Sequence, residues 1–146
     1  MAGFDLDGFL PYQLAVLSAR VSGEFSTLYK RKFGISIAEW RVVAHLSQSG
    51  KVSVREIHDR VDMDKSKVSR AASRLETAGY ITKAPNPEDG RLVTLALTPK
   101  GTAMVAELAP LAQNFEADVM RELGDDGPNF RAALARLIAR QKQVSP

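Results

Sequence analysis

The segment DKSKVSRAASRLETAG, residues 64–79, has the pattern of a helix with one apolar side. Asp64 is a residue type that often caps the start of a helix, and Gly79 is one that often ends a helix, so the segment is predicted to be helical as far as Ala78. Apolar side chains recur along it at intervals of three and four residues, which is the spacing of a single buried stripe. The stripe consists of Val68, Ala71, Ala72 and Leu75.

The remaining surface of this helix is made of short hydroxyls and long cations. Five basic residues and one acidic residue lie between Lys65 and Lys83, whereas the whole chain has a formal net charge of only +3. Such a face is either an ordinary solvated surface or a binding site for an anionic partner, and the neighbouring segments decide between the two. Opposite the stripe lie Ser66, Arg70, Ser73 and Thr77, flanked by Lys67, Ser69 and Arg74.

Two capped helices and one longer helix are predicted ahead of this segment. Ser53 and Glu56 have the spacing of a capping box, and so do Ser36 and Glu39. The first pair starts a short helix that ends before a turn at Asp62 and Met63, and the second starts a helix that ends at Gly50. Residues 12–32 form the long helix, whose stripe consists of Leu14, Leu17, Val21, Phe25 and Leu28. The short helix has Val54, Ile57 and Val61 on one side, and the helix after Ser36 buries Ile37, Trp40, Val43 and Ala44.

A β-hairpin and two further helices are predicted after the segment. Residues 80–84 form one strand, and the alternation of residues 91–97 places Val93, Leu95 and Leu97 on one face of the other. Pro85, Pro87 and Gly90 interrupt regular structure between them. Thr98 with Pro99 then predicts a helix start, and the helices span about residues 99–123 and 129–143.

This order of elements is typical of a winged helix-turn-helix fold. The predicted fold class is mainly α with a small β-hairpin wing, and residues 35–98 form the DNA-binding lobe. In such a lobe, Ser and Lys side chains donate to phosphates, while Arg can donate two parallel bonds to guanine O6 and N7. The predicted DNA-binding residues of the helix are Lys65, Ser66, Lys67, Ser69, Arg70, Ser73 and Arg74.

The hairpin and the helix start after it contain a more specific pattern. Asp89, Arg91, Leu95, Leu97, Thr98 and Gly101 occupy every fixed position of D-x-R-x-x-x-L-x-L-T-x-x-G. In this pattern, and in the order of helices over the whole chain, the protein resembles the MarR (multiple antibiotic resistance regulator) family. The resemblance implies that Arg91 enters a minor groove of DNA from the wing tip and that Asp89 orients it through a salt bridge. A guanidinium suits the negative potential of a narrow groove.

The resemblance also implies a homodimer that binds a pseudo-palindromic operator, more often as a repressor, and that responds to a ligand. Residues 1–34 would supply an N-terminal dimerisation helix, and residues 99–146 would supply C-terminal dimerisation helices. The sequence agrees independently, because long amphipathic helices outside a small lobe need a partner surface to cover their stripes.

An effector site is a further expectation, because members of the family often bind small aromatic or phenolic acids between the dimer helices and the DNA-binding lobe. Tyr12 and Trp40 could line such a pocket, with Arg20 as the partner of a carboxylate and His45 nearby. The alternative is that Trp40 is an ordinary core residue, since it lies on the apolar stripe of its helix.

Several classes of function are excluded or remain as alternatives. The chain contains no cysteine, which excludes disulfides, thiolate metal sites and thiol-based redox sensing, and no metal or cofactor is expected. His45 and His58 have no spacing that suggests catalysis, so no enzyme is expected. An adaptor that binds proteins and a non-specific architectural DNA binder stay open, although an adaptor has no need of Arg70, Arg74 and Arg91.

A membrane partner is not expected. The longest uncharged stretch, residues 8–19, is too short to cross a bilayer, and the residues before it lack the basic start of a signal peptide. A cytoplasmic protein with double-stranded DNA as its partner is therefore the expectation.

Overall fold

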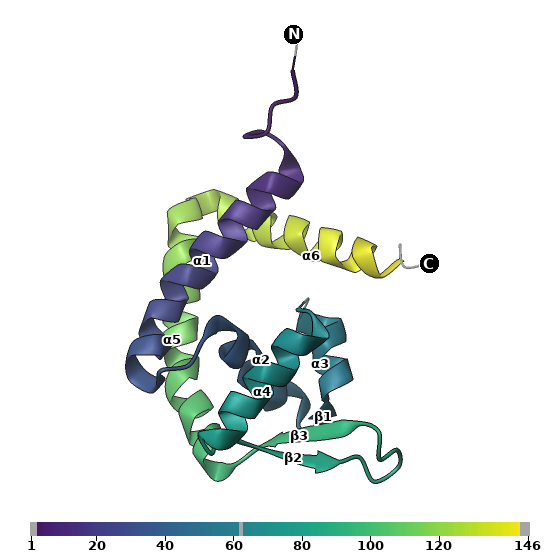
Figure 1. Ribbon diagram of the computed structural model, residues 1–146. Helices are drawn as coiled ribbons and strands as arrows, with labels where there is room; N and C mark the ends of the chain where they lie inside the picture. Colours follow the sequence, from purple (N-terminus) through teal and green to yellow (C-terminus); the bar gives the residue numbers. More distant parts are fainter. Residues whose placement is uncertain (1–2, 62, 144–146) are drawn as a thin grey trace. The chain divides into compact units, whose positions relative to one another are not determined.

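The computed structural model describes residues 3–61 and 63–143, with side chains for residues 3–60 and 63–140. It is mainly helical with one small sheet, which confirms the predicted fold class (Figure 1). The turn predicted at Asp62 and the predicted burial of Val61 lie outside the described residues and side chains. The elements are α1 (Leu10–Phe33), α2 (Ile37–Ser49), β1 (Val52–Ser53), α3 (Val54–Val61), α4 (Lys65–Thr77), β2 (Ile81–Pro85), β3 (Val93–Leu97), α5 (Pro99–Leu123), η1 (Gly124–Asp126) and α6 (Gly127–Gln143).

Side-chain caps start α2 and α3 where the sequence predicts them. The Ser36 hydroxyl accepts the backbone N–H of Glu39 at 3.2 Å and donates to the carboxylate of Glu39 at 2.6 Å. Ser53 and Glu56 form the reciprocal capping box of α3. Each cap satisfies a backbone donor that a helix start leaves without an intrahelical partner.

The sheet has three strands, whereas the sequence predicts only two. The β2–β3 hairpin is antiparallel, with Lys83 opposite Leu95, and β1 adds to the other edge of β3 with Val52 opposite that same leucine. The order is therefore β1-β3-β2. A two-residue strand has no periodicity of its own, which is why the sequence pattern did not reveal β1.

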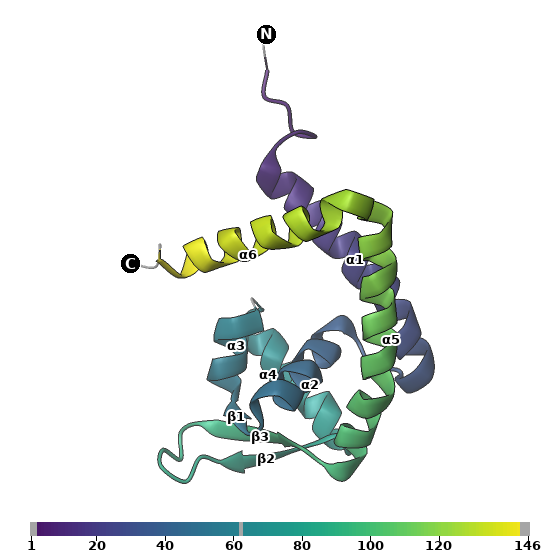
Figure 2. The same cartoon turned by 180° about the vertical axis from the view of Figure 1, so that it is seen from behind.

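The core of the lobe forms where α2, α3 and α4 pack over this sheet (Figure 2). The predicted stripe of α4 is fully buried at all four positions. On β3 the alternation is only partly realised, because Leu95 is fully buried while Val93 is exposed and Leu97 is half-buried. Other fully buried members of this core are Val42, Val43 and Ile57.

Thr98 and Gly101 hold the corner between α4, the hairpin and α5. The Thr98 hydroxyl donates to the Gly79 carbonyl at 2.6 Å and accepts the Gly101 N–H at 3.1 Å. A Cβ at position 101 would lie 2.1 Å from the Tyr80 carbonyl oxygen, so only glycine fits there. These two positions of the hairpin pattern therefore have a structural reason that is independent of any ligand.

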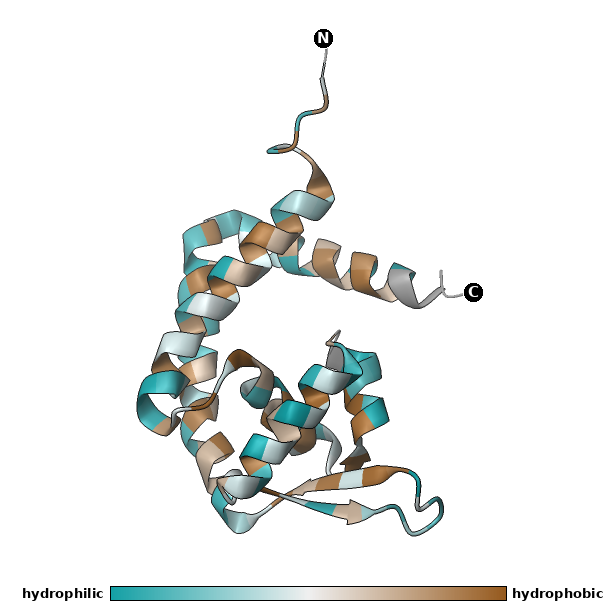
Figure 3. Ribbon diagram, viewed as in Figure 1, coloured by the Kyte–Doolittle hydropathy of each residue, from teal (hydrophilic) through white to brown (hydrophobic). Residues whose placement is uncertain are grey.

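The chain divides into two compact units, Met1–Ala109 and Pro110–Pro146. In the first unit, α1 buries Phe25 and Tyr29 but leaves Leu14 and Leu17 exposed. In the second unit, Figure 3 shows bands of hydrophobic residues along α6. Leu137 and Ile138 of this helix are exposed. Apolar stripes on these helices are thus incompletely covered within one chain. No helix of the described residues is long and apolar enough to cross a membrane.

Candidate nucleic-acid interface

The outer surface of α4 is the candidate interface, and every predicted DNA-binding residue on it is exposed. The buried stripe fixes the rotation of the helix, so the hydroxyls and cations must face away from the core. Arg70 lies at the middle of this surface. Within the described residues it makes no hydrogen bond or ion pair, although its charge acts on Asp64. We call the exposed residues Lys65, Ser66, Lys67, Ser69, Arg70, Ser73 and Arg74 the basic face of α4.

Asp64 caps the start of α4 next to the basic face. Its carboxylate accepts the backbone N–H of Lys67 and the hydroxyl of Ser66, each at 2.8 Å. These two hydrogen bonds, followed by the charges of Lys67 and Arg70, lower the pKa of Asp64 below its usual value. The hydroxyl of Ser66 is thus already donating within the chain, while its oxygen can still accept a bond.

A lysine of the wing connects β2 to the middle of α4. Lys83 Nζ donates to the Ser73 hydroxyl at 2.8 Å and lies 3.9 Å from Glu76 Oε1. Because the Ser73 oxygen accepts this bond, its own O–H remains available to donate to a phosphate. Glu76, the one acidic residue between Lys65 and Lys83, thus lies beside Lys83.

Arg74 has a partner that the sequence did not reveal. Its Nη1 lies 3.8 Å from Oε2 of Glu39 on α2, and the Glu39 side chain is only 10% exposed. The Arg74 side chain remains 63% exposed, so it belongs to the basic face and also contacts the capped start of α2. The two residues are far apart in the sequence, and only the packing of α4 against α2 brings them together.

The wing loop has its own hydrogen-bond framework. Asn86 Oδ1 accepts the backbone N–H groups of Glu88 and Asp89, and Leu92 N–H donates to the Asp89 carbonyl. Arg91 Nε and Nη2 donate to the two carboxylate oxygens of Asp89 at 3.0 and 3.1 Å. The ion pair named by the sequence pattern is therefore present and bidentate, and its role toward DNA stays a prediction.

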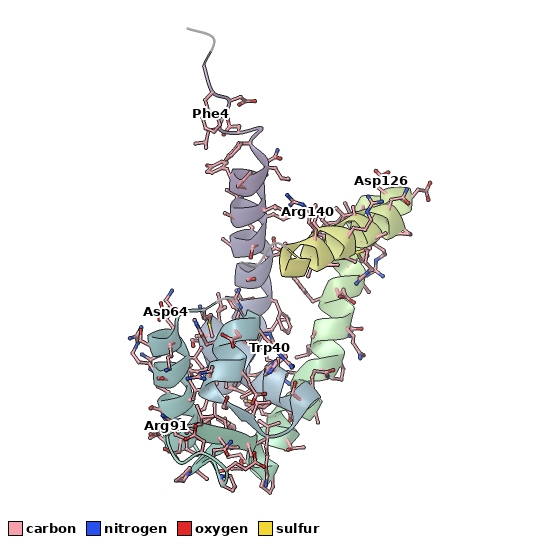
Figure 4. All side chains as sticks on the ribbon, turned by 90° about the vertical axis from the view of Figure 1, so that its right-hand side faces the viewer. Phe4, Trp40, Asp64, Arg91, Asp126 and Arg140 are labelled. Carbon is pink, nitrogen blue, oxygen red and sulfur yellow. The ribbon has the colours of Figure 1, made fainter. Side chains whose placement is uncertain are left out.

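The wing arginine is almost fully solvent-exposed despite this ion pair. The Arg91 side chain is 90% exposed and lies in the loop that joins β2 to β3 (Figure 4). Its hydrogen bonds lower the pKa of Asp89, and the charge of Arg55 on α3 adds to that effect. Arg55 is thus a cation near the wing that sequence reasoning missed, because its place beside the wing depends on the pairing of β1 with β3.

Within the described residues, no hydrogen bond, ion pair or ring contact joins any two residues of the predicted effector site, Tyr12, Arg20, Trp40 and His45. Trp40 stacks on Tyr29 and meets the ring edge of Phe25, with ring centroids 5.6 and 5.4 Å apart. Burial raises the pKa of Tyr29 to about 12, with Arg41 opposing the shift, so this phenol stays neutral. Tyr12 lies near the N-terminal end of α1. At a rise of 1.5 Å per residue, it is about 20 Å from Phe25 along the helix axis. Figure 4 shows Trp40 at the lobe and Phe4 beyond the far end of α1.

The two histidines lie in different local environments. His45 Nε2 is buried and has no hydrogen-bond partner in the described structure. Burial lowers the pKa of His45, the charge of Arg60 acts in the same direction, and Glu56 opposes them. His58 Nδ1 contacts the carbonyl oxygen of Met63, which links α3 to the residues just before α4. Neither Arg20 nor His45 is joined to Trp40 by a described contact, so the effector site remains a prediction.

Known proteins are similar to this chain in sequence and in fold. The sequence model of the MarR family matches residues 33–92, which run from the end of α1 into the wing loop. A curated relative, the HTH-type transcriptional repressor IacR of Pseudomonas putida, is 30% identical over 98 residues, covering 67% of this chain and 58% of its own length. The chain belongs to the MarR family. This is a family of transcriptional regulators rather than enzymes, in agreement with the sequence prediction.

Solved structures extend the likeness beyond the lobe. A MarR/EmrR family transcriptional regulator from Acinetobacter sp. ADP1 superposes with a TM-score of 0.83 at 27% identity, covering 97% of this chain and 100% of its own. Bordetella bronchiseptica BpsR, whose DNA binding is regulated by 6-hydroxynicotinic acid, shares the fold with a TM-score of 0.80 at 20% identity, covering 99% of this chain and 100% of its own. This chain spans about half the length of the curated relatives that it matches.

Proposed function

We propose that this MarR-family protein is a sequence-specific DNA-binding transcription regulator. The observation that carries the proposal is the joint exposure of the basic face of α4 and of Arg91 on the same winged lobe. An α-helix fits the major groove of B-DNA, and a wing arginine fits the adjacent minor groove. A cytoplasmic location is part of this proposal, since the partner is chromosomal DNA.

The test of this proposal is selection of duplexes from a random-sequence DNA library with the whole chain. A specific regulator enriches one motif and binds it at least about 10³-fold more tightly than mixed-sequence duplex at physiological salt. Enrichment of no motif, with salt-sensitive binding intact, would favour the architectural DNA binder. If the chain binds no duplex DNA even at low salt, the adaptor that binds proteins is favoured instead.

We further propose that the active form is a homodimer that binds a pseudo-palindromic site. The exposed leucines of α1 and the exposed Leu137 and Ile138 of α6 support this, because such stripes seldom remain uncovered in solution. A two-fold axis would set the two α4 helices about 34 Å apart, one turn of DNA. Residues 1–34 and 99–146 supply the dimerisation helices in this proposal.

Sedimentation at micromolar concentration tests the assembly, with a dimer as the expected species. Leu17→Ser provides the matched variant, because it removes an exposed apolar side chain from α1 and leaves the core of the lobe intact. It should shift the equilibrium toward monomer and weaken binding of the selected duplex. A wild-type monomer that binds this duplex at full affinity would exclude the dimer.

Repression and release by a small aromatic or phenolic acid complete the proposed function. Repression is supported by the similarity to IacR, a transcriptional repressor. Trp40 is half-buried against Tyr29 and Phe25, and it offers a ring on which such an acid could stack. Salicylate and related acids, titrated against the complex with the selected duplex, test the idea. Release should be lost in Trp40→Ala, and acids that leave the complex intact at millimolar concentration would contradict it.

A further inference from the structure

Two arginines of the candidate DNA surface are held by carboxylates, and only one of these pairs belongs to the hairpin sequence pattern. Asp89 holds Arg91 within the exposed wing loop. Glu39 holds Arg74 from a different helix and from a nearly buried position. The hairpin pattern therefore does not explain the pair of Glu39 and Arg74.

Glu39 has little freedom to move. Its carboxylate lies in the first turn of α2, and the residue is 8% exposed. Its Oε2 atom accepts the Ser36 hydroxyl at 2.6 Å, and the same atom lies 3.8 Å from Arg74 Nη1. A carboxylate removed from water needs such partners, because burial of an uncompensated charge is costly. The position of Glu39 is thus fixed by α2 before DNA binds.

Arg74, in contrast, keeps most of its donors in solvent. A guanidinium has five N–H donors, and the Arg74 side chain is 63% exposed while one of its nitrogens lies toward Glu39. The planar group can therefore lie against Glu39 on one side and donate to a nucleic acid on the other. A lysine at this position would offer a single point charge without such a fixed plane.

We propose that Glu39 is a positioning residue for DNA recognition, which holds the Arg74 guanidinium at the α2 edge of the basic face of α4. This inference rests on the proposed DNA-binding function. Holding the guanidinium there reduces the entropy lost when it contacts DNA and limits its reach to one part of the site. Discrimination between sequences, more than overall affinity, is the property that depends on Glu39.

Glu39→Gln tests this role, because it keeps the size of the side chain and an oxygen that can accept the Ser36 hydroxyl, and it removes the charge. The measured quantity is the ratio of affinities for the selected duplex and a mixed-sequence duplex. The ratio should fall about five- to tenfold, as expected when one charge-assisted contact loses its geometry. Affinity for the mixed duplex should not fall, since the variant has one negative charge fewer.

Glu107→Gln is the matched control. It makes the same chemical change and the same change in net charge, but on α5, where Glu107 pairs with Lys32 at 3.7 Å. Its affinity ratio should equal that of the wild type. An equal fall in both glutamine variants would show a general charge effect and overturn the positioning role.

A double-mutant cycle with Arg74→Lys separates positioning from helix stability, because the lysine keeps the cation and loses the fork. Arg74→Lys should lower the ratio as much as Glu39→Gln, and the two changes together should lower it no further. If Glu39→Gln unfolds, Arg74→Lys still tests the positioning role of Glu39. Full retention of the affinity ratio in Arg74→Lys would overturn the proposal. Additive losses would overturn it as well.

The wild-type result separates this inference from the proposed function. A wild-type chain without preference for the selected duplex would exclude both the proposed function and the role of Glu39. A clear wild-type preference that Glu39→Gln and Arg74→Lys leave unchanged removes only the role of Glu39, and the DNA-binding function then stands.

Discussion

Helix α4 and the wing loop present their arginines in different ways. In α4 the backbone is fixed by a fully buried stripe, while Arg70 makes no hydrogen bond or ion pair within the described part of the chain. In the wing loop little is buried, and Arg91 is held by a bidentate bond to Asp89. A rigid helix can present a side chain that adapts to base edges, whereas an exposed loop needs the side chain itself to be oriented in advance.

The largest expected effect is on the buried side of α4. Leu75 is 0% exposed, so Leu75→Ala should lower the free energy of unfolding by about 2–5 kcal/mol through lost burial and a cavity. Urea denaturation followed by circular dichroism measures the change. Ser69→Ala on the exposed side of α4 is the control and should stay within about 0.5 kcal/mol. Similar stability in both variants would show that the stripe does not anchor the helix.

The connection of the wing to α5 should be nearly as sensitive. Gly101→Ala would force a Cβ to 2.1 Å from the Tyr80 carbonyl, and relief of that overlap should cost about 1–3 kcal/mol of stability. Gly23→Ala in α1 is the matched control, since nothing lies within 4 Å of its added Cβ and alanine favours a helix. The midpoint temperature of thermal denaturation should fall for Gly101→Ala and rise for Gly23→Ala. Equal shifts in the two variants would contradict the packing at Tyr80.

The wing arginine should have a smaller effect, seen in the salt dependence of binding. Arg91→Ala removes one cation from the surface, so affinity for the selected duplex should fall and the slope of its logarithm against the logarithm of salt should decrease by about one. Fluorescence anisotropy over a salt series measures both. An unchanged slope would mean that Arg91 does not contact DNA.

Asp89→Ala makes the opposite change in charge and tests whether orientation matters. Simple electrostatics predicts tighter binding, whereas loss of the bidentate bond to Arg91 predicts weaker binding. We expect weaker binding together with coupling in the Asp89 and Arg91 double-mutant cycle. Tighter binding without coupling would make Asp89 an ordinary turn residue.

The smallest expected effect is the dependence of the wing on pH. Because the pKa of Asp89 is lowered in the folded chain, its contribution to the stability of the loop is complete above the unfolded pKa of about 3.9 and is lost as the pH falls through the folded value. An NMR titration of the Asp89 carboxyl should show this midpoint below that of a short exposed peptide. A midpoint at or above the peptide value would contradict a formed ion pair.

The elements that the sequence predicted well depend on local chemistry. The caps at Ser36, Ser53 and Asp64 involve residues within three positions of one another, and the stripe of α4 repeats within a single helix. The bond between Asp89 and Arg91 spans two positions and belongs to a specific pattern. Such features need no knowledge of how distant segments pack.

The features that the sequence did not reveal all join distant segments. Strand β1 exists because Val52 pairs with Leu95, and a two-residue strand has no periodicity to detect. The contact of Arg74 with Glu39 depends on how α2 packs against α4, and the bond from Lys83 to Ser73 depends on the position of β2. The basic face was therefore predictable as a set of residues, but the partners that hold its side chains were not.

Whether α4 reads DNA is measured by the affinity of Arg70→Ala for the selected duplex and for mixed-sequence duplex, beside wild type at one salt concentration. Arg70 is exposed at the middle of the basic face, so its loss should weaken binding of the selected duplex by about 1–3 kcal/mol and relax sequence preference. The thermal unfolding of the variant should remain that of the wild type. A folded Arg70→Ala protein with unchanged affinity and unchanged preference would contradict the assignment of α4 as the element that reads DNA.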